Sequence, residues 1–158
     1  MPTLRIDVVA VSSWGNWSQA AGAAPASLKD GTDATFVQQG AGSGTLFECQ
    51  LASVAGLRGA IITSVVLVLR EGYLSGGSAR WRTAAGSQSV GTAVWPPATV
   101  SHDFSAHRPG GGTWRGSDFE ASWVGLVTNT EGSRLYEMYA LVSYEWPTEG
   151  MVTVVGAG

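Results

Sequence analysis

The stretch "RLYEMYALVSYEW", Arg134–Trp146, decides the fold class, because apolar or aromatic side chains occupy every second position along it. Met138, Ala140 and Val142 belong to this set, whereas Glu137 and Glu145 belong to the alternate set. A period of two places the sets on opposite faces of a β-strand. The run is too long for a casual hairpin, so it predicts a principal strand of a sheet.

Other segments extend this β pattern. The stretch "AIITSVVLVL", residues 60–69, is apolar on both faces, which predicts a central strand covered on both sides. Further period-two runs cover residues 3–11, 44–51 and 117–127. Glycine- and proline-rich segments separate the runs and mark loops. We therefore predict an all-β fold, a single antiparallel β-sandwich of jelly-roll type over residues 1–147, with residues 148–158 as an apolar β-prone tail.

Charge and cysteine content exclude several classes of protein. The chain has 158 residues and a formal net charge of −3, and Lys29 is its only lysine. Phosphate binding needs clustered Lys and Arg, so we predict no nucleic-acid partner. The longest apolar run is about half the length that crosses a bilayer, so we predict no membrane partner. Cys49 is the only cysteine, which excludes an intramolecular disulfide and a multi-cysteine zinc cluster.

The stretch "DGTD", Asp30–Asp33, allows two interpretations. Asp30 and Asp33 could bind calcium, which prefers oxygen ligands held in a loop, although their spacing is not that of an EF-hand. Asp-Gly is also a common turn pair, in which the Asp side chain accepts hydrogen bonds from backbone N–H groups further along the chain. We expect the turn, with calcium as the alternative and no other cofactor.

Catalytic motifs are missing from the sequence. It contains no G-x-S-x-G elbow, no H-E-x-x-H pair and no Walker-type loop. His102 and His107 lie in a polar stretch without a third ligand at a metal-binding spacing, so we expect both at the surface. Glu137 and Glu145 would lie about 26 Å apart along one strand, too far for a glycosidase carboxylate pair. We predict a non-enzymatic protein without catalytic residues.

The seven tryptophans are the most prominent candidates for binding. Trp14, Trp95 and Trp114 lie near predicted loops, where an indole ring can stack on a sugar. The other interpretation is that these rings pack beneath glycine-rich loops or against a neighbouring subunit. Carbohydrate binding through these three tryptophans is therefore one candidate function.

The C-terminal tail suggests self-association. Its apolar residues are separated from the long strand by Pro147 and Gly150. Such a segment can close its own sheet or add a strand to a neighbouring chain. We predict a homo-oligomer, with a trimer as one arrangement. The predicted subunit interface consists of Met151, Val152, Val154 and Val155 of the tail and Leu4 and Ile6 of the first strand.

The order of these patterns resembles a β-sandwich module of virion proteins of tailed bacteriophages. The resemblance rests on "LKDGTDATFV" at 28–37, "VVLVLR" at 65–70 and "YALVSYEW" at 139–146, and it extends from about Trp14 to Trp146. It implies a non-enzymatic structural or adhesive unit on the surface of a phage head or tail. Such a unit would be a minor tail protein or a capsid decoration subunit, and its partners would be other virion proteins. In the alternative function, the module would recognise glycans of the host surface.

Overall fold

The structure is a computed structural model that describes residues 1–21, 24–41 and 45–148. Within these residues the chain forms ten β-strands and two short 3-10 turns. The strands are β1 (Thr3–Ser13), β2 (Trp17–Ala21), β3 (Phe36–Gln39), β4 (Thr45–Leu51), β5 (Ile61–Gly72), β6 (Leu74–Thr83), β7 (Gly86–Val94), β8 (Ala98–Asp103), β9 (Ser122–Thr128) and β10 (Arg134–Glu145). The 3-10 turns are η1 (Ala26–Leu28) and η2 (Gly116–Glu120).

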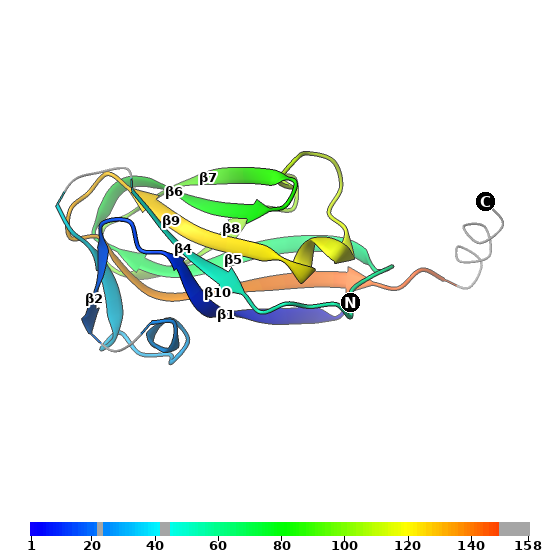
Figure 1. Ribbon diagram of the computed structural model, residues 1–158, viewed down its shortest axis with the longest axis horizontal. Helices are drawn as coiled ribbons and strands as arrows, with labels where there is room; N and C mark the ends of the chain where they lie inside the picture. The colour runs from blue at the N-terminus through cyan, green and yellow to red at the C-terminus, as the bar shows by residue number, and fades with distance from the viewer. Residues whose placement is uncertain (22–23, 42–44, 149–158) are drawn as a thin grey trace.

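The strands form two layers, which Figure 1 shows along their length. In one layer, β10 is the central strand. One edge of β10 pairs with β5, which in turn pairs with β8. The other edge of β10 pairs with the first half of β1 and with β3, which in turn pairs with β2. In the other layer, the second half of β1 is followed by β4, β9, β6 and β7. β1 thus passes from one layer to the other after Asp7. Because all these pairs are antiparallel, the predicted antiparallel β-sandwich of jelly-roll type is confirmed.

Alternating side chains of both layers form one hydrophobic core. Val65, Leu67 and Leu69 of β5 are fully buried, as are Met138 and Ala140 of β10, which agrees with the predicted alternation. An aromatic cluster closes one end of the core, with ring centroids 5.2 to 6.2 Å apart. Its members are Trp81, Phe104, Trp114 and Phe119.

The structure corrects two predictions for the chain ends. Ile6 is only 2% exposed and belongs to the core, and Leu4 packs partly against that core, so Ile6 has no surface to offer a second subunit. Trp146, the last residue of the stretch predicted as one strand, lies beyond the end of β10 and is exposed. The tail residues of the predicted interface, Met151, Val152, Val154 and Val155, lie outside the described residues.

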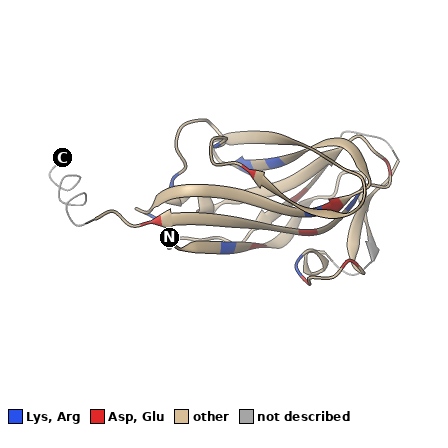
Figure 2. Cartoon of the chain, turned by 180° about the vertical axis from the view of Figure 1, so that it is seen from behind, with Lys and Arg blue, Asp and Glu red and all other residues tan. Residues whose placement is uncertain are grey.

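The antiparallel order collects the connections at two ends of the sandwich. The β1–β2, β5–β6, β7–β8 and β9–β10 connections lie at the left end in Figure 1, whereas the N-terminus, the end of β10 and η2 lie at the right end. Figure 2 shows charged residues scattered thinly over both layers, as the low content of charged residues predicts. Among the described residues, no helix has the length and apolar content needed to span a membrane.

Candidate functional site

The candidate site begins between β5 and β6, where Tyr73 has a positive φ of 60°. This conformation is strained for a bulky side chain, and such residues gather at functional sites. The Tyr73 N–H donates to the Trp95 carbonyl oxygen at 2.7 Å, and the Ser133 hydroxyl donates to the Tyr73 carbonyl oxygen at 3.3 Å. Gly72 permits close packing, because a Cβ there would lie 2.9 Å from the Cα of Pro97. The backbone therefore fixes Trp95 beside Tyr73.

From Trp95, a continuous series of contacts crosses the end of the sandwich. The rings of Trp95 and Tyr73 meet edge to face, with centroids 6.2 Å apart. The guanidinium carbon of Arg134 lies 5.4 Å from the ring centroid of Tyr73 and 4.2 Å from that of Phe36. The rings of Phe36 and Tyr136 follow at 5.5 Å. We call these five residues the aromatic row.

The aromatic row changes from exposed to buried along its length. Trp95 is 63% exposed, Tyr73, Arg134 and Phe36 are half-buried, and Tyr136 is buried. The buried end anchors the row, whereas the exposed end leaves a large indole surface in contact with water. An exposed aromatic ring on a fixed backbone is suited to contact a ligand face, because little side-chain freedom is lost on binding.

Arg134 differs from five of the other arginines in its charge environment. Five arginines form ion pairs with carboxylates, namely Arg5, Arg58, Arg70, Arg82 and Arg108. No carboxylate among the described residues forms an ion pair with Arg134, whose cation instead contacts two aromatic rings. A guanidinium stacked in this way keeps the N–H donors at its edge free for an oxygen acceptor.

Two of the three predicted stacking tryptophans remain accessible. Trp95 belongs to the aromatic row. Trp14 is 37% exposed in the β1–β2 connection, which lies at the same end of the sandwich, and its ring packs against Phe47. The prediction for Trp114 is corrected, because this ring is only 4% exposed in the core and its Nε1 donates to the Phe104 carbonyl oxygen at 2.7 Å.

The sequence did not identify Tyr73, Phe36 or Arg134 as members of a site. Their backbone positions meet only because β10 pairs with both β3 and β5. The signals available were the Gly-Tyr pair at the end of a long apolar strand and the Trp-Pro-Pro segment that follows β7. Neither signal reveals the positive φ of Tyr73 or its contact with Arg134.

The "DGTD" stretch forms a hydrogen-bonded turn. Asp30 accepts hydrogen bonds from the Thr32 N–H, at 3.1 Å, and from the Thr35 hydroxyl. Both carboxylate oxygens of Asp33 accept from Arg70, at 2.6 and 2.7 Å, and this hydrogen bonding holds the pKa of Asp33 below its usual range. Among the described residues, no three His, Cys, Asp or Glu side chains gather as metal ligands. Calcium binding at Asp30 and Asp33 stays a prediction.

The two histidines have different surroundings. His107 is exposed as expected, but His102 is only 4% exposed, which corrects its predicted place at the surface. Its Nε2 lies 3.2 Å from Oε1 of Glu71, which is fully buried and also accepts a hydrogen bond from the Thr92 hydroxyl. This buried cluster joins β5, β7 and β8 immediately before Gly72, so it supports the backbone that carries the aromatic row.

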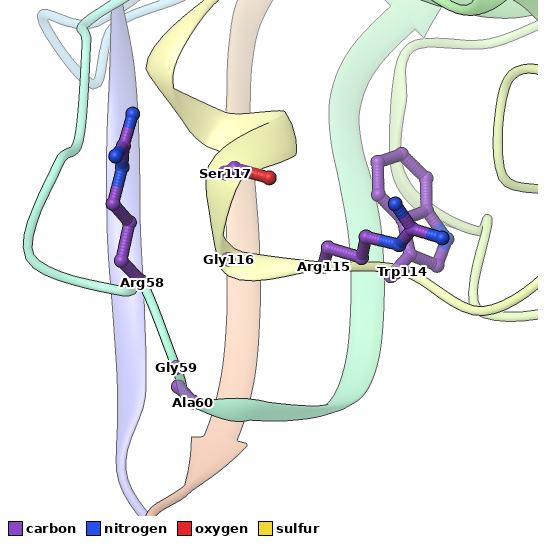
Figure 3. A pocket seen from close by; sticks show the side chains of 7 residues that line it. All are labelled: Arg58, Gly59, Ala60, Trp114, Arg115, Gly116 and Ser117. Atoms are coloured by element: carbon purple, nitrogen blue, oxygen red, sulfur yellow. The ribbon is translucent and has the colours of Figure 1, made fainter. Parts of the chain in front are cut away.

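A hollow with a volume of ≈ 520 Å³ lies at the end of the sandwich opposite the aromatic row (Figure 3). Its lining residues are Arg58, Gly59, Ala60, Trp114, Arg115, Gly116 and Ser117. Arg58 donates to both carboxylate oxygens of Glu120, so its charge is already paired. The lining includes no imidazole or carboxylate that could activate the Ser117 hydroxyl as a nucleophile.

Comparisons with known proteins add a distant structural likeness. No protein-family model matches the chain, and no curated protein matches it. Among solved structures, the chain is similar to "CBM35 from Cellvibrio japonicus Abf62", with 12% sequence identity and a TM-score of 0.43. The alignment covers 90% of this chain and 94% of that chain. A likeness of this degree carries no argument about function.

Proposed function

We propose that this chain is a non-catalytic β-sandwich that binds glycans through the aromatic row. The observation that carries the proposal is Trp95, an exposed indole whose main-chain carbonyl accepts the N–H of Tyr73 and whose ring meets the Tyr73 ring. The apolar face of a sugar can stack on such a ring, while the polar edge of the sugar remains hydrated. A rigid aromatic side chain loses little entropy when it binds.

The position of the aromatic row favours recognition of a surface. The row lies at one end of the elongated sandwich, whereas the N-terminus and the end of β10 lie at the other (Figure 1). A module attached through its terminal end would therefore present Trp95 outward. This arrangement suits an adhesive unit that binds an extended glycan.

The resemblance to tailed-phage virion proteins supplies a biological setting for the proposal. In that setting the module is a minor tail protein or capsid decoration subunit on the particle surface, and the glycan belongs to the host. Self-association and docking on other virion proteins are part of the same proposal. Light scattering on the full chain, beside a chain that ends at Pro147, tests assembly through the tail. A monomer in both cases would contradict it.

Titration with polysaccharides, followed by tryptophan fluorescence, tests glycan binding. Trp95→Ala should lower the affinity about tenfold or more, because the main contact surface is lost. Trp146→Ala is the matched control, since Trp146 is also exposed, at 54%, but directly follows the end of β10, which lies at the opposite end of the sandwich. Equal losses in both variants would contradict a site at Trp95. An absence of binding across bacterial surface polysaccharides would overturn the proposed function.

Calcium provides a separate test of the turn at Asp30 and Asp33. If calcium binds these carboxylates, a chelator should lower the Tm of the full chain, and Asp30→Asn should abolish that response. A Tm that is the same with and without chelator would leave the loop as a turn held by its own hydrogen bonds.

A further inference from the structure

Among the described arginines that lie over aromatic rings, Arg134 alone has no carboxylate partner. Arg5 and Arg82 also lie over aromatic rings, at 3.8 Å from the centroid of Tyr139 and 4.0 Å from that of Trp123. Both of these arginines donate to a carboxylate: Arg5 Nε donates to Asp7 at 2.7 Å, and Arg82 donates to both oxygens of Glu48. Arg134 contacts two rings, yet no described carboxylate pairs with it.

The geometry leaves the hydrogen-bonding edge of Arg134 available. A guanidinium uses its faces for stacking on rings and its edge for up to five N–H donors. The rings of Phe36 and Tyr73 contact the side chain of Arg134, and the described part of the chain provides no acceptor for its guanidinium donors. Carboxylate and phosphate groups have two oxygens in the spacing that fits such a fork.

We infer that Arg134 makes the aromatic row selective for glycans that carry oxyanions, either carboxylate or phosphate groups. The inference rests on the glycan-binding function proposed above. Trp95 contacts the Tyr73 ring and Arg134 contacts the same ring, so the stacking surface and the cation are neighbours. A sugar that stacks on Trp95 can therefore place a charged substituent, or that of the next sugar, at Arg134.

The net charge of the protein implies that any selectivity for anionic glycans arises locally. The chain carries a formal net charge of −3, so long-range attraction does not bring an anionic polymer to its surface. Selectivity for an anion must then come from a charge close to the stacking surface. Within the aromatic row, Arg134 is the only charged residue.

The decisive experiment compares ligands that differ only in charge. The full chain is titrated with polygalacturonate and with the same polymer after methyl esterification, which removes the carboxylate charge. The expected result is an affinity about 10- to 100-fold higher for the charged polymer, because hydrogen bonds between the Arg134 guanidinium and a carboxylate are stronger than those to a neutral ester. Purified teichoic acid, a phosphate-containing wall polymer, beside uncharged dextran distinguishes phosphate from carboxylate as the preferred anion.

Variants of Arg134 locate the effect. Arg134→Met keeps an apolar stem between the rings and should remove the preference for the charged polymer, while Arg134→Lys should keep part of it. Arg5→Met is the matched control, because Arg5 is also stacked on a ring but is paired with Asp7. The control should bind like the unmodified chain, and circular dichroism of each variant checks that the fold is retained.

The possible outcomes separate the two proposals. If the unmodified chain binds the neutral polymers as tightly as the charged ones, the inference about Arg134 is overturned and the glycan-binding function stands. If charged polymers are preferred but Arg134→Met keeps that preference, the anion binds elsewhere and the inference is again overturned. If no polymer of any charge binds, the proposed function fails and the inference fails with it.

Discussion

Replacing His102 with leucine should destabilise the protein by about 3 kcal/mol. His102 and Glu71 are 4% and 0% exposed, and His102 Nε2 lies 3.2 Å from Glu71 Oε1. Glu71 Oε2 has no hydrogen-bond partner among the described residues, so the carboxylate depends on Oε1 and its two neighbours, His102 and Thr92. With leucine at 102, only the Thr92 hydroxyl would remain for a fully buried carboxyl group.

The size of this destabilisation depends on whether one member of the buried pair is replaced or both are. Losing one partner of a buried ionic or hydrogen-bonded pair destabilises by about 3–5 kcal/mol, and the lower value applies here because Thr92 still donates. Replacing both members with leucine removes the buried polar atoms, so the double variant should return to within about 1 kcal/mol of the unmodified chain.

Urea unfolding followed by tryptophan fluorescence measures this difference, with the fully buried Trp81 as a reporter. At a typical slope of about 2 kcal/mol per molar urea, His102→Leu should lower the midpoint by about 1.5 M. His107→Leu is the control, because His107 is exposed and should change stability by less than about 0.5 kcal/mol. If His102→Leu behaves like this control, or if the single effects simply add in the double variant, the pair does not hold these strands together.

Further predictions concern close packing, burial and pH. Gly116→Ala should prevent folding or destabilise the protein by more than about 3 kcal/mol in thermal melts, because the new Cβ would lie 1.6 Å from the Leu57 carbonyl oxygen. Gly56→Ala is the control and should be neutral, because nothing lies within 4 Å of a Cβ at that position. Burial raises the pKa of the Cys49 thiol to about 12, so a thiol reagent at pH 8 should label it only after denaturant unfolds the chain; labelling at the unfolded rate would contradict its burial. Burial acts to raise the pKa of Glu48, but hydrogen bonds from Arg82 and a serine hydroxyl outweigh it and lower that pKa from 4.5. The resulting stability is present above pH 4.5 and is lost as pH falls through the lower folded value, so Glu48→Gln should reduce the fall in Tm between about pH 5 and 3; an unchanged fall would refute this assignment.

Local pattern was sufficient to predict the strands but not their partners. The alternation in β10 and the apolar run of β5 predicted both long strands, because side-chain period is set by the strand backbone itself. The Asp-Gly pair likewise predicted the turn that Asp30 holds, since its hydrogen bonds reach only a few residues along the chain. These features depend on neighbours in sequence.

Features that depend on contacts between distant segments were not predicted correctly. Trp114 and His102 lie in glycine-rich and polar stretches, which are typical of exposed loops, yet both side chains are buried. Trp114 packs against Trp81, and His102 faces Glu71, which lies on another strand. Burial of a polar or aromatic side chain in a loop-like sequence requires knowledge of what covers it, and the sequence pattern does not contain that information.

The backbone that carries the candidate site is concentrated in three consecutive residues, Glu71, Gly72 and Tyr73. Glu71 is tied to β7 and β8 through buried polar contacts, Gly72 admits Pro97 at a distance that any side chain would prevent, and Tyr73 accepts a strained φ to bond the Trp95 carbonyl oxygen. Each feature is costly alone, and together they place one exposed indole. A protein that needed only a stable sandwich could make this connection with a glycine in place of Tyr73. Folding requires only that the chain turn at this point. The strain at Tyr73 is therefore better explained by a requirement for its ring, which contacts both Trp95 and Arg134.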